Sequence, residues 1–393
     1  MEHARRNVFL LACCQALLLT NAVTLIAVNG LAGYALADNK ALATLPATTY
    51  ILGAALSTFP LSLLMKRVGR RNGFLTGGAF GLAGSLVATL AMAMANFPLL
   101  CVGTFLLGFY NAVGQYYRFA AADAAPADFK AKAISLVLAG GLVGGIVGPE
   151  ISKITIGLVQ PQFLATYASL FVYCSISMAI IAFLAIPAAM ESASHEPARP
   201  LAKIVAQPVF VVAAGVAALG YGVMSLLMTA TPLAMGFCGY PYASAAGVIA
   251  AHVIAMFGPS FFTGSLIQRF GVLNVMLVGT ATMFACVGVA LSGELVMNFW
   301  WALVLLGIGW NFMFVGGTTL LTEAYRPSEK AKTQGLNEII IFGVQALSSF
   351  ASGVLVNTAG WRMLNYVSLP LLVLAGAAAL WLLLRRRVAV AVS

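Results

Sequence analysis

The sequence predicts an all-α membrane protein with twelve transmembrane helices arranged as two six-helix bundles. Its composition is the first observation: 61% of the 393 residues are hydrophobic, 8% are charged and the mean hydropathy is +0.97. Soluble domains of this length do not have such a composition. The other two observations are the spacing of the apolar runs and the distribution of basic residues between the loops.

Each apolar run is long enough to cross a bilayer as a helix, at about 20 residues per crossing. The first apolar run continues past twenty residues, longer than the apolar core of a secretory leader, so we expect a membrane helix there. The twelve predicted spans are residues 8–35, 43–65, 73–95, 98–119, 133–158, 165–187, 208–233, 243–267, 272–292, 299–321, 333–357 and 363–384.

The basic residues gather in alternate loops. With both termini placed in the cytoplasm, 18 of the 21 Lys and Arg residues face inward, and only Lys40, Lys153 and Arg362 face outward. This asymmetry predicts a multi-pass protein of the bacterial inner membrane with both ends cytoplasmic. It also accounts for the net charge of +10, so we expect the lipid bilayer, and no nucleic acid, as the surrounding partner.

The two halves of the chain repeat each other. Gly69 in the loop after the second span recurs as Gly271 after the eighth, 202 residues later, and Lys130 recurs as Lys330, 200 residues later. Parallel repeats of this kind are typical of transporters with a central site. We therefore expect an N-terminal bundle over 1–190, a cytoplasmic linker over 191–207 and a C-terminal bundle over 208–393. We expect the protein to be a monomer.

Two motifs in the second half carry metal-capable side chains one helical turn apart. Met224 and Met228 form an MxxxM pair, and His252 and Met256 form an HxxxM pair. Residues at i and i+4 share a helix face, and thioether and imidazole ligands suit Cu(I). The other interpretation is that the methionines fill the core. Helix-breaking residues flank both pairs, namely Gly222, Pro232, Gly258 and Pro259.

The six-plus-six arrangement resembles the major facilitator superfamily over nearly the whole chain. Its gating loop motif is matched by Arg67, Gly69 and Arg70 and again by Arg269 and Gly271, although Lys66 stands at the acidic position. The paired Met and His motifs resemble those of CcoA-like copper importers within that superfamily. The resemblance implies import of copper, as Cu(I), for assembly of haem–copper (cbb3-type) oxidases, with copper as substrate and no resident cofactor.

Further residues have candidate roles. Cys238, Cys101, Cys13, Cys14 and Met235 are candidate accessory metal ligands, against the alternative of small buried hydrophobes. Glu150 and Glu338 are candidates for proton coupling because carboxylates within membrane spans are often functional. Both also lie near span ends, where a solvated or ion-paired acid is ordinary.

Two other transport functions remain open. A permease for an organic solute such as a flavin would use Tyr116, Tyr117, Trp310 and Phe312 as stacking surfaces. A drug exporter is suggested by the Gly144 to Pro149 stretch. A copper-binding sensor or assembly chaperone is a third class. We expect no enzyme activity, since the chain has no nucleotide-binding loop and no phosphorylation motif.

Overall fold

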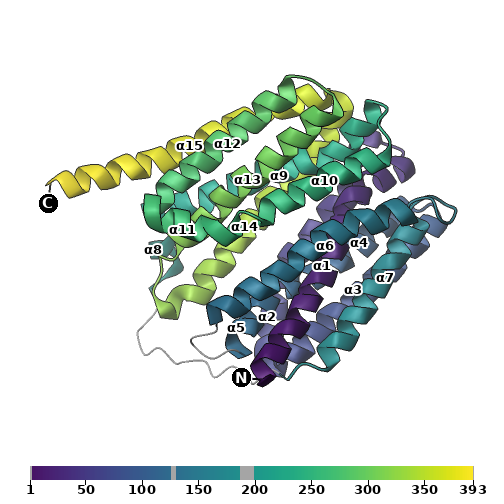
Figure 1. The fold of residues 1–393 in the computed structure, drawn as a ribbon, viewed down its shortest axis with the longest axis horizontal. Coiled ribbons are helices and arrows are strands. Elements are labelled where there is room, and N and C mark those ends of the chain that lie inside the picture. The colour runs from purple at the N-terminus through teal and green to yellow at the C-terminus, as the bar shows by residue number, and fades with distance from the viewer. Residues whose placement is uncertain (1, 125–129, 186–198, 393) are drawn as a thin grey trace. The chain divides into compact units, whose positions relative to one another are not determined.

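The computed structural model describes residues 2–124, 130–185 and 199–392, except for the side chains of a few residues within these ranges. The described chain is helical throughout, apart from turns and loops (Figure 1). It divides into two compact units. Unit 1 comprises Met1–Glu191 together with Tyr240–Val253, and unit 2 comprises Ser192–Gly239 together with Ile254–Ser393.

The helices of unit 1 carry the first six predicted spans. They are α1 (Glu2–Leu36), α2 (Leu45–Val68), α3 (Arg70–Ala93), α4 (Phe97–Gly114), α5 (Tyr117–Ala124), α6 (Lys130–Thr155) and α7 (Leu164–Ala182). The fourth span is divided: α4 ends at Gly114 and the chain turns at Gln115 before α5 begins.

The helices of unit 2 carry the remaining spans. They are α8 (Leu201–Val205), α9 (Pro208–Phe237), α11 (Ser260–Phe270), α12 (Val272–Leu291), α13 (Val296–Leu321), α14 (Lys330–Thr358) and α15 (Gly360–Val392). Helix α10 (Tyr242–Phe257) is divided between the two units: its residues up to Val253 belong to unit 1 and those from Ile254 onward belong to unit 2. Among the described helices ten could cross a membrane by length and composition, and the bent pair α10 and α11 adds an eleventh.

Small residues let α1 and α6 pack backbone against backbone. A Cβ atom on Gly140 would lie 2.2 Å from the carbonyl oxygen of Ala12, and one on Gly144 would lie 2.3 Å from that of Ala16. Helices in membranes associate through such close approaches because lipid provides no hydrophobic drive between them. The glycines of the 144–149 stretch therefore have a packing role here.

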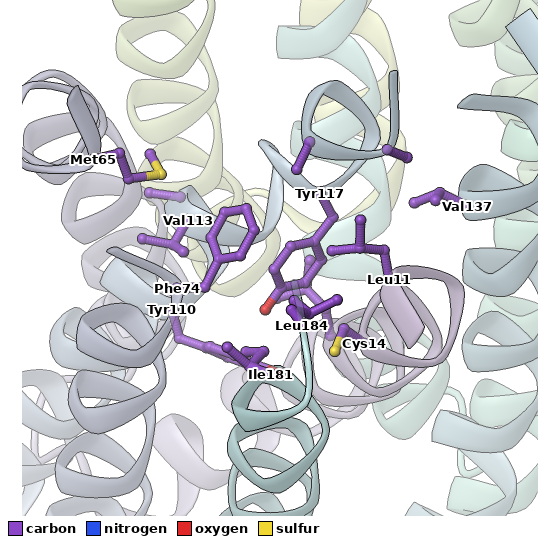
Figure 2. Packing of buried hydrophobic residues seen from close by; sticks show 14 of the residues in the cluster. Leu11, Cys14, Met65, Phe74, Tyr110, Val113, Tyr117, Val137, Ile181 and Leu184 are labelled. Atoms are coloured by element: carbon purple, nitrogen blue, oxygen red, sulfur yellow. The ribbon is translucent and has the colours of Figure 1, made fainter. Parts of the chain in front are cut away.

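Aromatic and aliphatic side chains fill the core of unit 1 (Figure 2). Tyr110 and Tyr117 are fully buried there, and the Tyr117 ring packs edge-on against Phe74 with 4.9 Å between centroids. Cys14 of α1 lies in the same cluster. Tyr117 is therefore part of the core of unit 1, and its role as a stacking surface for substrate stays a prediction.

The loops that join α2 to α3 and α11 to α12 have the same geometry. Each consists of one glycine, Gly69 with φ +82° and ψ 159° and Gly271 with φ +85° and ψ 147°. This region is essentially restricted to glycine. The repeat predicted from the sequence thus recurs as a repeated backbone turn.

A buried ion pair fixes the start of unit 2. The side chain of Glu329 is fully buried and accepts hydrogen bonds from the Arg199 backbone N–H and Nε, both at 2.8 Å, and from Arg199 Nη2 at 2.7 Å. The backbone N–H of Arg326 donates to the same carboxylate. These bonds, those from Arg199 first, hold the pKa of Glu329 well below its ordinary value. The predicted linker, 191–207, is described only from Arg199 onward.

Candidate substrate-binding site

The eighth predicted span is broken in the middle. Helices α10 and α11 meet at Gly258 and Pro259 with a bend of 41°. Proline has no N–H to donate and its ring opposes a continuous helix, so carbonyls in the preceding turn lose their partners. Such a break inside a membrane needs other donors to satisfy them. By contrast, Pro232 lies inside an uninterrupted α9.

Asn311 of α13 supplies the missing hydrogen bonds at this break. Its Nδ2 donates to the carbonyl oxygen of Met256 and to Ser260 Oγ, each at 2.7 Å. Its Oδ1 accepts from Thr263 Oγ1, also at 2.7 Å. The Asn311 side chain is buried and all three bonds lie within unit 2. The Asn311 carboxamide thus connects α13 both to the end of α10 and to the start of α11.

Four aromatic side chains gather beside the break, and we call them the aromatic cluster: Tyr221 of α9, Phe257 of α10, and Trp310 and Phe314 of α13. The Trp310 and Phe314 rings are stacked, 4.8 Å apart with 11° between their planes. Tyr221 meets both edge-on, at 5.2 Å and 5.5 Å. Phe257 lies 6.1 Å from Trp310. Such a cluster offers flat apolar faces to a planar ligand.

Helical periodicity explains which predicted stacking residues enter the cluster. Trp310 and Phe314 are four residues apart and share a face, whereas Phe312 points elsewhere. A Cβ atom on Gly279 of α12 would lie 2.8 Å from that of Phe312, so Phe312 packs toward α12. Tyr116 lies in unit 1, where its hydroxyl is 3.5 Å from the carbonyl oxygen of Thr58. Of the four predicted residues, Trp310 alone belongs to the aromatic cluster.

Four buried polar side-chain atoms of unit 2 have no hydrogen-bond partner among the described residues, and Ser328 Oγ and Asn365 Oδ1 are two of them. The other two are Nε1 of Trp310, whose residue is 4% exposed, and Oε1 of Gln345 on α14, whose residue is 9% exposed. Buried polar atoms are nearly always paired. Trp310 and Gln345 thus have incomplete hydrogen bonding within the described part of the chain.

The four predicted copper ligands are all buried. Met224 and Met228 lie on α9, which packs on α13, α14 and α15. His252 and Met256 lie on α10, but His252 falls in unit 1 and Met256 in unit 2 with the other two methionines. The structure therefore does not bring the four side chains together as one cluster within either unit, and the ligand role stays a prediction.

The accessory metal candidates are dispersed. Met235 is buried on α9, and Cys14 lies in the core of unit 1, where its Sγ is 3.9 Å from the carbonyl oxygen of Ser177. Cys13 and Cys101 are partly buried. Burial and the neighbouring Glu294 raise the pKa of Cys238, which favours its neutral thiol over the metal-binding thiolate. Within the ranges described, no three His, Cys, Asp or Glu residues form a metal-binding group.

The two candidate coupling carboxylates have ordinary surroundings. Glu150 is exposed and forms a 2.6 Å ion pair with Lys153 one turn away on α6. Glu338 is half-buried on α14 and accepts a 3.4 Å hydrogen bond from Asn337.

The predicted gate residues lie at the repeated turns: Arg67 and Arg269 are exposed at the ends of α2 and α11, and Arg70 begins α3. Their roles stay predictions.

Sequence reasoning missed the residues that shape this site. Asn311, Tyr221, Phe257, Phe314 and Gln345 are absent from the predicted site. A polar residue in an apolar run, as in Trp310-Asn311, is the signal that could have identified Asn311. Nothing in the sequence indicates that its partners are on α10 and α11.

Comparisons with known proteins agree on the family. The Major Facilitator Superfamily model matches residues 8–315 and 242–392. The riboflavin transporter RfnT of Brucella anthropi is 39% identical over 374 residues, covering 94% of both chains. A Bacillus subtilis transporter of the same superfamily, YdeG, is 29% identical over 350 residues, covering 84% of this chain and 80% of its own.

Solved structures support the fold. The nucleoside transporter NupG superposes with a TM-score of 0.72 at 14% identity, covering 95% of this chain and 99% of its own. A D-xylose–proton symporter superposes with a TM-score of 0.74 at 12% identity, covering 95% and 96%. The chain belongs to the Major Facilitator Superfamily and has that superfamily's helical transporter fold.

Proposed function

We propose that this protein is a secondary transporter that imports a flavin, with riboflavin as the principal substrate. The observation that carries the proposal is the 39% identity, over 94% of both chains, to a riboflavin transporter. This relationship favours the flavin permease over the copper importer among the alternatives open at the level of sequence.

The aromatic cluster gives the proposal a physical basis. The isoalloxazine ring of a flavin is planar and aromatic, and its stacking on aromatic side chains contributes about 0.5–1.5 kcal/mol per ring pair beyond area burial. Trp310 and Phe314 form a stacked pair, and Tyr221 closes one edge. Two or three such contacts provide selectivity for a flat aromatic solute without any charged side chain in the cluster.

Uptake in a bacterium that lacks its own riboflavin synthesis and transport tests this directly. Cells expressing the protein are expected to accumulate radiolabelled riboflavin and to grow on low external riboflavin. Trp310→Ala is expected to raise the half-saturating concentration up to about tenfold, since loss of one stacking contact with the flavin costs up to about 1.5 kcal/mol. Trp301→Ala is the matched control, because Trp301 is on the same helix but half exposed.

Copper uptake by the same cells tests the remaining alternative. The copper interpretation rests on Met224, Met228, His252 and Met256, and on the resemblance to CcoA-like importers with their link to oxidase assembly. Two results together would overturn the flavin proposal in favour of copper. The unmodified protein would accumulate copper and take up no riboflavin, and the Met224→Leu, Met256→Leu double variant would lose the copper accumulation.

A further inference from the structure

Trp310 and Gln345 carry a complementary pair of buried polar atoms. The indole Nε1–H is a donor and Gln345 Oε1 is an acceptor, and neither has a hydrogen-bond partner within the part of the chain described. By contrast, Asn311, next to Trp310, makes three hydrogen bonds of 2.7 Å. Trp310 Nε1 and Gln345 Oε1 are thus two of the four unpaired buried polar side-chain atoms among the described residues of unit 2.

Both residues lie on helices that pack against α9, which carries Tyr221 of the aromatic cluster. Trp310 is a member of it. Gln345 follows Val344, which packs with Tyr221 and Phe314 against the small core formed by Ala217, Ala218 and Ile341. The hydroxyl of Ser225, one turn beyond Tyr221 on α9, lies 3.4 Å from the carbonyl oxygen of Gln345. Helix α9 thus packs against both α13, which carries Trp310, and α14, which carries Gln345.

The chemistry of the pair indicates a neutral ligand that both donates and accepts hydrogen bonds. An indole N–H cannot coordinate a cation, and the cluster contains no charged side chain to pair with an anion. A carboxamide offers an acceptor and a donor side by side. Its complement is a group with an adjacent N–H and C=O, such as an imide.

We propose that Gln345 and Trp310 recognise the imide edge of the flavin pyrimidine ring while the aromatic cluster holds its apolar face. This inference rests on the proposed function. Gln345 Oε1 accepts the flavin N3–H, its Nε2 donates to an adjacent flavin carbonyl, and Trp310 Nε1 donates to a flavin carbonyl. The two residues select for an unsubstituted imide, and the rings select for planarity.

The test compares riboflavin with 3-methylriboflavin, in which the N3–H is replaced by a methyl group. Binding is measured by quenching of flavin fluorescence on the purified protein in lipid nanodiscs. The unmodified protein is expected to bind riboflavin at least about tenfold more tightly than the methylated analogue. Gln345→Leu is expected to bind riboflavin about tenfold more weakly and to bind the two flavins equally. Gln162→Leu, at an exposed loop position, is expected to preserve the preference.

Thermal stability separates recognition from a structural role. Removing an unpaired buried polar group relieves a desolvation cost, so the Tm of ligand-free Gln345→Leu is expected to equal or exceed that of the unmodified protein while its riboflavin-induced shift decreases. Trp310→Phe keeps a ring but removes the donor. It is expected to weaken riboflavin binding and to keep the penalty for 3-methylriboflavin.

Each contrary result has a distinct meaning. Equal binding of the two flavins by the unmodified protein, or a preference that survives in Gln345→Leu, would overturn the imide assignment while leaving flavin transport intact. A lower Tm of ligand-free Gln345→Leu with unchanged flavin preference would make Gln345 a structural residue. Absence of any riboflavin binding or uptake would overturn the proposed function and this inference with it.

Discussion

Replacing Asn311 by leucine removes the three hydrogen bonds that hold the broken span together. Leucine has a similar volume, so the main loss is polar. At about 0.6 kcal/mol per bond, the average for side-chain bonds within membranes, the cost is about 2 kcal/mol. At about 1 kcal/mol per bond, with an additional cost for leaving the Met256 carbonyl unpaired, it reaches about 4 kcal/mol.

The assay is thermal unfolding of the purified protein in nanodiscs, combined with riboflavin uptake. Asn311→Leu is expected to lower Tm by several degrees, and to weaken uptake because Phe257 at the end of α10 is no longer held near Trp310. Thr263→Val, which removes one of the three bonds, is expected to show about a third of the stability loss.

Asn274→Leu serves as the control, because Asn274 is exposed and bonds only to the carbonyl of Phe270 one turn before it. Its effect on Tm is expected to be small. If Asn311→Leu matches the unmodified protein within about 0.5 kcal/mol, the threshold for an ordinary surface change, then the carboxamide does not stabilise the break and our account of it fails.

Three further predictions concern the rest of the molecule. The pKa of Glu329 is lowered on folding, so its ion pair with Arg199 stabilises the protein above the unfolded carboxyl pKa of about 4.3 and loses this effect as pH falls further. The Tm difference between the unmodified protein and Glu329→Gln should therefore be constant from pH 7 to 5 and shrink below about pH 4; a difference that disappears by pH 6 would refute this. Gly69→Ala and Gly271→Ala should each cost about 1–3 kcal/mol because of their backbone angles, whereas Gly215→Ala in α9, where a Cβ would meet nothing, should not destabilise the protein. Reporter fusions after Ala193 and at Ser393 should read as cytoplasmic and one at Asp38 as external, from the 18-to-3 charge asymmetry; an external signal from Ala193 would contradict the predicted topology.

The fold could be predicted from the sequence because a bilayer imposes a simple requirement. Each crossing needs an apolar run of fixed length, and every predicted span coincides with a helix or with two consecutive helices. The breaks within spans were harder to predict. Gly258 and Pro259 interrupt their span while Pro232 does not interrupt α9, although each position places a proline in an apolar run.

The site could be predicted only in part, because spacing along one helix does not reveal which helices are neighbours. Met224 and Met228 share a face of α9 as expected, but the packing partners of that helix are α13, α14 and α15. The aromatic cluster draws Tyr221, Phe257, Trp310 and Phe314 from three helices, and only tertiary structure brings them together. Trp310 was predicted because it is a large aromatic residue in an apolar run; its neighbours were not.

The Arg199–Glu329 pair defines where the second bundle can be cut from the first. Besides the ion pair, Lys332 Nζ donates to the carbonyl of Arg199, and Gln207 Nε2 donates to that of Ala324 at 2.8 Å. A fragment that starts at Pro208, the first residue of α9, would leave Glu329 buried without its cation, which is costly. Split-protein and fusion designs should therefore retain Arg199 with the C-terminal fragment. Insertions belong before Arg199, where they leave these contacts in place.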